Sequence, residues 1–230
     1  GKKVSIYEKN PFPGGRVAQK KVKGYTIDVG PSFLLMPQEF EELFAFCGEK
    51  MVDVLPLHAV HPHYRLHYWD AQHMDVSAYL PTMLTEIQRV TPRDEEGFLR
   101  FMEHEQRVYG SIYPAFIAQS PSSIWDIVFS LRIFSFLLAD GFHSMWDHMD
   151  TFFSDSKLKL AFSFQSMYLG QSPLSTPATY AIIPYVELTQ GVWYPSAGMY
   201  AVVSQLEKIA QKKGVKIHYG ARVKEILVEN

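Results

Sequence analysis

The sequence has one cysteine and no excess of either charge. Its 230 residues include 22 Lys or Arg and 24 Asp or Glu, which gives a formal net charge of −2. The single thiol, Cys47, excludes an internal disulfide and a cysteine-based zinc site, and it favours a reducing compartment. Because the charge is balanced, we expect no nucleic-acid partner.

A long apolar run is also absent. The longest uncharged stretch, residues 160–186, contains Gly170 and three prolines as well as many Ser, Thr and Gln residues. A membrane-spanning helix needs about 20 consecutive, predominantly apolar residues, so we expect no such helix. A protein without one can still lie on a membrane surface.

The third absence concerns glycine. Residues 4–7 form a short apolar run that Glu8 closes, as in the second strand of a dinucleotide-binding βαβ unit, where the acid binds ribose hydroxyls. The fingerprint G-x-G-x-x-G should lie roughly 20 residues earlier. Only seven residues precede Glu8. We therefore expect the sequence to begin inside its nucleotide-binding domain, although an ordinary strand and turn would give the same local pattern.

The order of expected elements indicates the α/β (α+β) class. Strands are expected over residues 17–22, 24–28, 52–57, 64–69, 74–77, 192–194, 215–219 and 222–228. Helices are expected over residues 37–48, 80–90, 91–109, 157–169, 177–188 and 198–213, with a further helix from residue 124. This pattern predicts a Rossmann-like core with a helical insertion, divided into residues 1–50, 51–195 and 196–230.

Five histidines lie between residues 58 and 73, which raises the alternative of a metal site. The segment has no H-E-x-x-H motif, and its histidines share one strand face only in part. We therefore expect no metal site and assign these side chains to the surface or to packing. Nucleophilic catalysis also lacks support, because there is no G-x-S-x-G motif and Cys47 falls on the apolar face of an expected helix.

Five motifs occur in the order seen in one family of flavoproteins. They are E-K-N-x-x-x-G-G-R at residues 8–16, G-Y-x-x-D-x-G-P-S at 24–32, A-F-S-F-Q at 161–165, S-P-x-x-T-P at 172–177 and G-V-W-Y-P at 191–195. The chain resembles the bacterial and fungal type of phytoene desaturase (phytoene dehydrogenase), in the superfamily of FAD-dependent amine oxidases. The resemblance covers essentially the whole chain but is patchy between residues 51 and 156.

The resemblance implies an FAD-binding Rossmann-like core that is truncated at both ends in this sequence. It implies that Glu8 binds ribose, that the turn ending in Arg16 lies along the pyrophosphate or flavin, and that Val223 contacts adenine through its backbone. The implied cofactor-binding residues are Glu8, Gly14, Gly15, Arg16, Asp28, Gly30, Pro31 and Val223. Without the rest of the family pattern, we expect this 230-residue piece to bind FAD poorly and to be inactive by itself.

The implied reaction removes hydrogens across a C–C bond of a C40 or C30 polyene. An apolar tunnel would suit such a substrate, and the aromatic residues expected to line it are Phe164, Tyr180, Trp193 and Tyr194. Each of them is equally a candidate for the core. The resemblance further implies a cytoplasmic protein peripheral to a membrane, with oxygen or quinone as electron acceptor; the oligomeric state is not predicted.

Asp126 aligns with a carboxylate proposed as an acid/base group in some members of this family. The arginine that accompanies it there is replaced by Phe129, so a solvated carboxylate near a helix start is the competing interpretation. The alternatives left open are a carotenoid isomerase, ketolase or oxidase of the same subgroup, a non-catalytic flavin- or lipid-binding relative, and a nicotinamide dehydrogenase.

Overall fold

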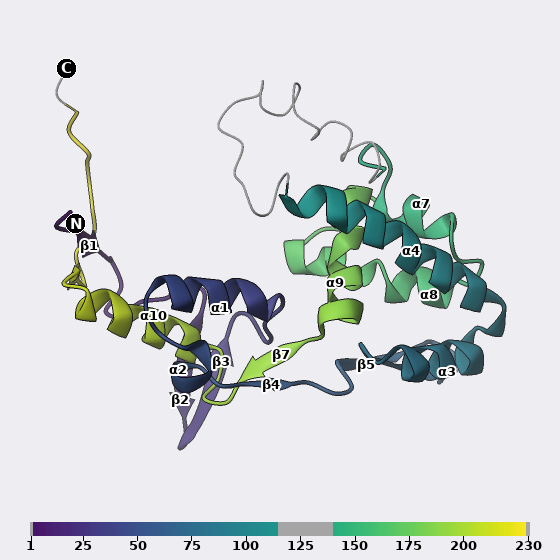
Figure 1. Ribbon diagram of the computed structural model, residues 1–230, viewed down its shortest axis with the longest axis horizontal. Helices are drawn as coiled ribbons and strands as arrows, with labels where there is room; N and C mark the ends of the chain where they lie inside the picture. Colours follow the sequence, from purple (N-terminus) through teal and green to yellow (C-terminus); the bar gives the residue numbers. More distant parts are fainter. Residues whose placement is uncertain (1, 115–139, 229–230) are drawn as a thin grey trace. The chain divides into compact units, whose positions relative to one another are not determined.

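The computed structural model describes residues 2–114 and 140–228, and its helices and strands confirm the mixed α/β class (Figure 1). Its contacts divide the chain into two compact units. Unit 1 comprises Gly1–Val60 and Val192–Asn230, and unit 2 comprises His61–Gly191. No helix among the described residues is long and apolar enough to cross a bilayer.

Unit 1 contains short paired strands and three helices. Its strand pairs are β1 (Ser5–Tyr7) parallel to β8 (Lys216–His218), β2 (Ala18–Val22) antiparallel to β3 (Tyr25–Val29), and β4 (Leu57–Ala59) antiparallel to β7 (Trp193–Pro195). Its helices are α1 (Pro37–Phe46), α2 (Met51–Val54) and α10 (Tyr200–Lys212). Segments from both ends of the sequence therefore build this unit together.

The core of unit 1 joins α1, α2 and α10. Phe44 of α1, Met51 and Leu55 around α2, and Ile209 of α10 are buried against one another. Pro37 fits the first turn of α1, because its fixed φ suits a helix and its missing N–H would have no intrahelical partner there. Burial of each such side chain contributes about 1.5–3 kcal/mol.

The described residues of unit 2 form one β-hairpin and a set of helices. The hairpin pairs β5 (Tyr64–His67) with β6 (His73–Val76). The helices are α3 (Leu80–Val90), η1 (Pro92–Asp94), α4 (Glu95–Ile112), α7 (Met145–Asp150), α8 (Ser156–Ala161), η3 (Phe164–Leu169), η4 (Ala178–Ala181) and α9 (Ile182–Gln190).

An aromatic and aliphatic core holds unit 2 together. Met83, Ile87 and Val90 recur at helical spacing along one face of α3 and are buried. Phe101 of α4 stacks on Phe162, which directly follows α8, with ring centroids 5.6 Å apart. The hairpin closes the same core through Met74 and Val76.

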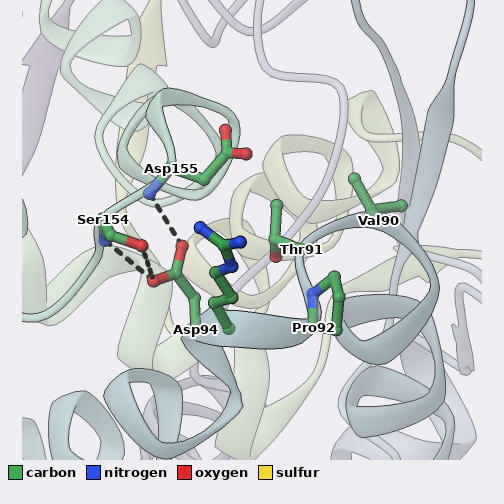
Figure 2. A pocket seen from close by; sticks show the side chains of 7 residues that line it. Val90, Thr91, Pro92, Asp94, Ser154 and Asp155 are labelled. Atoms are coloured by element: carbon green, nitrogen blue, oxygen red, sulfur yellow. Dashed lines mark hydrogen bonds between the residues drawn. The ribbon is translucent and has the colours of Figure 1, made fainter.

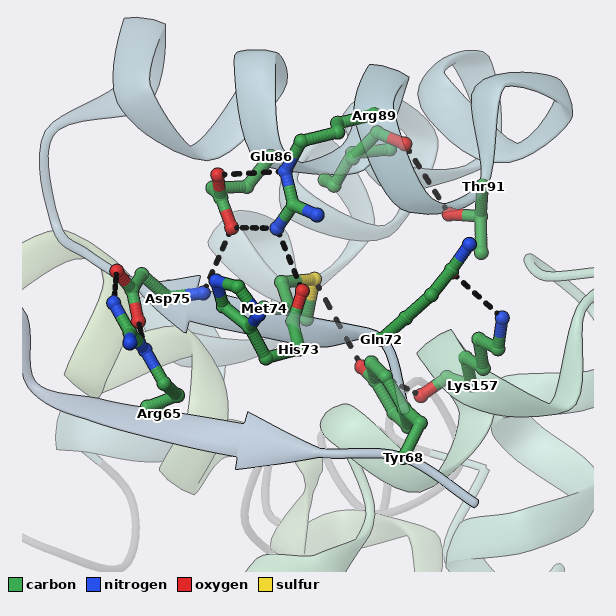
Figure 3. Close-up of polar contacts among 11 residues, drawn as sticks. Arg65, Tyr68, Gln72, His73, Met74, Asp75, Glu86, Arg89, Thr91 and Lys157 are labelled. Carbon is green, nitrogen blue, oxygen red and sulfur yellow. Dashed lines mark hydrogen bonds and ion pairs between the residues drawn. The ribbon is translucent and has the colours of Figure 1, made fainter. Parts of the chain in front are cut away.

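Polar contacts attach the hairpin to α3 and α8 (Figure 3). Arg65 of β5 pairs with Asp75 of β6 through two hydrogen bonds of 2.7 and 2.8 Å. Glu86 of α3 accepts the Asp75 backbone N–H at 2.9 Å. Lys157 of α8 donates to the carboxylate of Asp70 and, at 2.9 Å, to Gln72 in the hairpin turn. Exposed ion pairs contribute little free energy, so these contacts mainly fix the orientation of the hairpin relative to α3 and α8.

Two expected strands are wrong. Residues 52–57 were expected to be a strand, but Met51–Val54 form α2, because Met51 and Leu55 lie one turn apart and both face the core; β4 starts only at Leu57. Residues 222–228 form no regular structure, and their side chains are exposed with no strand partner among the described residues. The helix expected from residue 124 lies outside the described residues.

The start of the long helix also differs. The helix was expected from residue 91, but the Thr91 hydroxyl donates back to the carbonyl of Ile87 at 3.5 Å, so Thr91 ends α3. A 3-10 turn follows, and α4 begins at Glu95. Asp94 precedes α4 without capping it through its side chain, because its carboxylate accepts hydrogen bonds from Ser154 and Asp155.

We expect opposite effects from two glycine substitutions in α4. A Cβ on Gly97 would lie 2.1 Å from the backbone oxygen of Phe152, whereas a Cβ on Gly110 meets nothing within 4 Å. Gly97→Ala should therefore destabilise the full-length protein, while the control Gly110→Ala should stabilise it by about 0.5–1 kcal/mol through helix propensity. Thermal melting measures both; a Gly97→Ala protein as stable as Gly110→Ala would contradict the close contact.

Candidate functional site

Glu8 lies at the carboxyl end of a parallel strand pair in unit 1. Its backbone N–H donates to the carbonyl of His218 at 2.9 Å, and its carbonyl accepts from the backbone N–H of Ala221 at 2.8 Å. The carboxyl ends of strands β1 and β8 are therefore adjacent there. The half-buried carboxylate accepts the backbone N–H of Asn10 at 2.7 Å. Ligands of α/β proteins bind outside the carboxyl ends of parallel strands. Glu8 thus lies at such a strand end, and its contact with a ribose stays a prediction.

The glycine turn after Glu8 is closely packed. Gly14 has φ +102°, and a Cβ there would lie 2.3 Å from the carbonyl oxygen of Val17 and 3.1 Å from Val203 of α10. Gly30 has φ +124°, and its Cβ would lie 2.1 Å from the carbonyl oxygen of Arg16. Only glycine fits either position. The two motifs at residues 8–16 and 24–32 are thus in direct backbone contact.

Other residues of the turn remain open to solvent. Gly15 has φ +58°, and a Cβ added to it would meet nothing within 4 Å. The Arg16 side chain is exposed and makes no ion pair among residues 2–114 and 140–228. An acceptor at a strand end, an open glycine and a cation without an ion pair fit the ribose and phosphates of a dinucleotide.

Asp28 serves the structure of unit 1. Its carboxylate accepts from the Tyr194 hydroxyl at 2.7 Å and from the backbone N–H groups of Met199 at 2.7 Å and Tyr200 at 3.4 Å. Burial alone would raise the pKa of Asp28, but the hydrogen bonds from Tyr194 and Met199 outweigh it and lower the pKa below its usual value. A carboxylate at the start of α10 also suits the helix dipole.

Gly198 makes this arrangement fit. It has φ +87°, and a Cβ on it would lie 2.9 Å from the Asp28 carboxylate. The structure therefore pairs Asp28 and Tyr194 through a hydrogen bond between their side chains. A contact from either residue to a cofactor or substrate stays a prediction.

Two other expected cofactor residues are exposed. Pro31 follows the Gly30 turn and faces solvent. Val223 is 55% exposed and lies in the segment that forms no strand. Neither makes a contact that would define its role, and Asp126 lies outside the described residues.

The expected substrate residues fall into both units. In unit 2, Phe164 packs edge-on against Tyr64 with ring centroids 5.2 Å apart. It also lines a surface pocket of about 150 Å³, together with Leu66, His67, Tyr68, Trp69, Leu160 and Ala161. Tyr180 on η4 is 38% exposed. Trp193 and Tyr194 form β7 of unit 1, where Trp193 exchanges two backbone hydrogen bonds with Leu34 at 2.8 and 2.9 Å.

A larger pocket of about 400 Å³ lies in unit 2, and the buried carboxylate in its wall has a structural role (Figure 2). Asp94 lies at its wall and is only 3% exposed. Its carboxylate accepts from the N–H and hydroxyl of Ser154 at 2.8 and 2.6 Å and from the N–H of Asp155 at 2.8 Å. The carboxylate is thus used to attach the start of α4 to the loop before α8.

Glu187 is a buried carboxylate that no sequence motif singled out. It is fully buried in α9 and accepts from the hydroxyls of Tyr64 at 2.8 Å and Tyr168 at 3.1 Å and from the Gln165 amide at 3.1 Å. Burial raises the pKa of Glu187 above its usual value, although the three donors partly oppose the rise. A signal existed: Glu187 is the first charge after an uncharged stretch of 27 residues, 160–186.

Residues 1–230 match the flavin containing amine oxidoreductase family. The chain belongs to this family. Membership supports a flavin cofactor, in agreement with the groups around Glu8 and Arg16.

Relatives of this flavoprotein chain include enzymes of carotenoid chemistry. It is 35% identical over 227 residues to the zeta-carotene-forming phytoene desaturase of Myxococcus xanthus, which covers 98% of the chain and 44% of the relative. It is 33% identical over 227 residues to the 4,4'-diapolycopene oxygenase of Methylomonas sp, covering 98% and 46%. The chain thus spans less than half the length of these relatives.

Solved structures show the same fold. An oxidoreductase from Methanosarcina mazei superposes with a TM-score of 0.60 at 19% identity, over 99% of this chain and 48% of the other. At that identity the likeness establishes the fold alone. It agrees with the Rossmann-like architecture expected from the motifs.

Replacing Asp28 tests its structural role. In the full-length protein, Asp28→Asn puts an amide NH₂ against backbone donors and should lower the free energy of unfolding by about 1–3 kcal/mol at neutral pH. Tyr194→Phe, which removes one donor, should cost about 0.5–1.5 kcal/mol. Because the folded pKa of Asp28 is lowered, the advantage of wild type over Asp28→Asn should shrink as pH falls below about 4. Equal denaturation midpoints at pH 7 would contradict this role.

Glu187 should give the opposite pH dependence. A raised folded pKa means that the native state holds its proton above the pH at which the unfolded chain releases it, so stability falls as pH rises above about 4.3. Glu187→Gln removes this titration. We expect the stability of Glu187→Gln relative to wild type to increase from pH 4 towards neutrality, measured by denaturant unfolding of the full-length proteins. A constant or decreasing difference would show that the three donors outweigh burial.

Proposed function

We propose that the full-length protein containing this chain is an FAD-dependent carotenoid desaturase that introduces C=C bonds into a C40 or C30 polyene. The observation that carries the proposal is the 35% identity to a zeta-carotene-forming phytoene desaturase over 98% of the chain. The glycine turn and the strand-end carboxylate of unit 1 support the cofactor half of the proposal.

In this proposal unit 1 holds part of the FAD. Glu8 accepts hydrogen bonds from ribose hydroxyls, and Arg16 balances the charge of the pyrophosphate. Gly15 leaves room for a phosphate or flavin edge against the backbone. Asp28 acts indirectly, because it fixes the start of α10, against which the Gly14 turn packs. Bound FAD supplies the acceptor for the hydride equivalent removed from the substrate.

The proposed binding of the substrate depends on the burial of apolar surface. A polyene carries no charge, so it is held by surface burial of about 25 cal/mol per Å². Phe164 with its pocket and the aromatic residues Tyr180, Trp193 and Tyr194 supply such area in the proposal. Because the substrate is membrane-soluble, we infer a cytoplasmic protein peripheral to a membrane, with oxygen or quinone as electron acceptor.

A second candidate keeps the fold and changes the reaction. The 33% identity to a 4,4'-diapolycopene oxygenase favours a carotenoid oxidase or ketolase over other rivals. An isomerase or a non-catalytic flavin-binding relative would share the same site around Glu8. Products distinguish these alternatives.

The deciding experiment expresses the full-length protein in cells that accumulate phytoene. Extracted pigments and the visible spectrum of the purified protein are recorded together. We expect new polyenes that absorb at longer wavelength and a bound flavin. Flavin with oxygenated polyenes would move the assignment to an oxidase or ketolase, and flavin without new pigments to an isomerase or non-catalytic protein. Folded protein with neither signal would overturn the proposal.

The same assay tests Asp126 as the group that handles the proton. Asp126→Asn should lower the rate of polyene formation by about 10²–10⁴-fold with flavin retained, as for loss of a general acid or base. Glu103→Gln, which alters a 72% exposed carboxylate on α4, is the matched control and should leave the rate unchanged. Full turnover of Asp126→Asn would remove Asp126 from the reaction.

A further inference from the structure

Unit 2 contains a cluster of histidines and carboxylates away from every residue assigned above. Glu105 of α4 and His148 of α7 are 1% and 2% exposed. Their side chains meet through Glu105 Oε1 and His148 Nε2 at 2.8 Å. The other ring nitrogen of His148 hydrogen-bonds Asp140 at 3.1 Å. His104, beside Glu105 on α4, places its Nε2 4.0 Å from the same carboxylate oxygen.

The position of His104 is not explained by an ion pair between Glu105 and His148. Its Nε2 is buried and has no hydrogen-bond partner in the part of the chain that the structure describes. A buried polar atom left unpaired costs about 1–3 kcal/mol. Something that accepts a lone pair from this nitrogen would remove that cost.

The donor set is that of a metal site. One ligand atom each from His104, Glu105 and His148 lies within 4.8 Å of the other two. Two imidazoles and a carboxylate are ordinary ligands of zinc. Histidine ligands of zinc usually hold a carboxylate on the second ring nitrogen, and Asp140 occupies that place on His148.

The surroundings also suit an ion. The Phe152 ring packs against His104 and His148, with centroids 5.5 and 5.1 Å away, and forms an apolar wall. The carboxylates of Glu105 and Asp140 together offset the charge of a dication. Among the described residues, this is the one group with ligand atoms at such spacing.

We propose that His104, Glu105 and His148 bind one divalent transition-metal ion, with zinc as the ion that fits the donors, and that Asp140 orients His148. Binding replaces the Glu105–His148 hydrogen bond with two metal–ligand bonds, and any proton on His148 Nε2 passes to solvent. The ligand atoms move together to reach metal–ligand distances of about 2.0–2.2 Å. The ion then links α4 to α7. This site is independent of the flavin chemistry proposed above.

The test uses the full-length protein after treatment with a chelator and dialysis. Zn²⁺ is titrated by calorimetry, and Co²⁺ is added separately as a spectroscopic probe. We expect one high-affinity equivalent of Zn²⁺ per chain, a higher melting temperature with Zn²⁺, and the visible bands of tetrahedral Co²⁺. Absence of Zn²⁺ binding by the folded protein would overturn the proposal and leave a buried ion pair with water at His104.

Variants then assign the ligands. His104→Gln and Glu105→Gln should abolish the high-affinity binding and the Co²⁺ bands, and Asp140→Asn should weaken binding by about 10–100-fold. His67→Gln, which removes an exposed imidazole of the hairpin, is the control and should bind like wild type. Binding by His104→Gln equal to wild type would place the ion elsewhere and overturn the assignment. If His104→Gln fails to fold, Asp140→Asn, altered at a 40% exposed side chain, decides by the same measurement.

Discussion

A carboxylate taken out of water must be matched by hydrogen-bond donors, and in this protein the donors come from distant parts of the chain. Asp28 takes them from residues more than 160 positions away, at the β7–α10 junction. Asp94 takes them from Ser154 and Asp155, and Glu187 from Tyr64. Asp94 and Glu187 are 3% and 0% exposed, so either carboxylate would cost several kcal/mol if it were left unmatched, whereas Asp28 is partly buried. These three acids therefore decide which segments must be adjacent.

The constraint acts on the proposed cofactor region through α10. Asp28 fixes where α10 starts, and the Gly14 turn packs on Val203 one turn further along. The same turn leads from the Glu8 carboxylate to the Arg16 backbone, which touches Gly30. The contact of Asp28 with the start of α10 thus helps to set the spacing between the motifs at residues 8–16 and 24–32. Changes at Asp28 should therefore shift the Gly14 turn, on which the proposed cofactor region is built.

Much of the fold follows from periodicity and local chemistry. The α3 helix is marked by Met83, Ile87 and Val90 at helical spacing, and the β2–β3 pair by the turn at Lys23–Gly24. Residues 52–57 were misassigned because a short apolar run fits either a strand or a helical turn. Tertiary burial of Met51 and Leu55 decided the outcome. Local pattern alone does not contain that information.

The candidate sites also differ in how much of each the sequence could predict. Gly14 and Gly30 adopt backbone angles that favour glycine, as the motifs suggested, while the ribose contact expected of Glu8 stays a prediction. Such features depend on residues that are close together in the sequence. The density of histidines at residues 58–73 indicated no metal site, and the cluster at His104 and His148 had no signal in the sequence.

Spatial clusters depend on helix packing instead. His104 and His148 lie 44 positions apart and meet because α4 and α7 pack through Phe101, Phe152 and Phe153. Sequence density of a ligand type is therefore a poor guide when the ligands sit on helices, since only one face of each helix reaches the core. What supports the proposed site is the unpartnered Nε2 of His104 together with two further ligand residues nearby, and that grouping becomes visible only once the side chains have been placed.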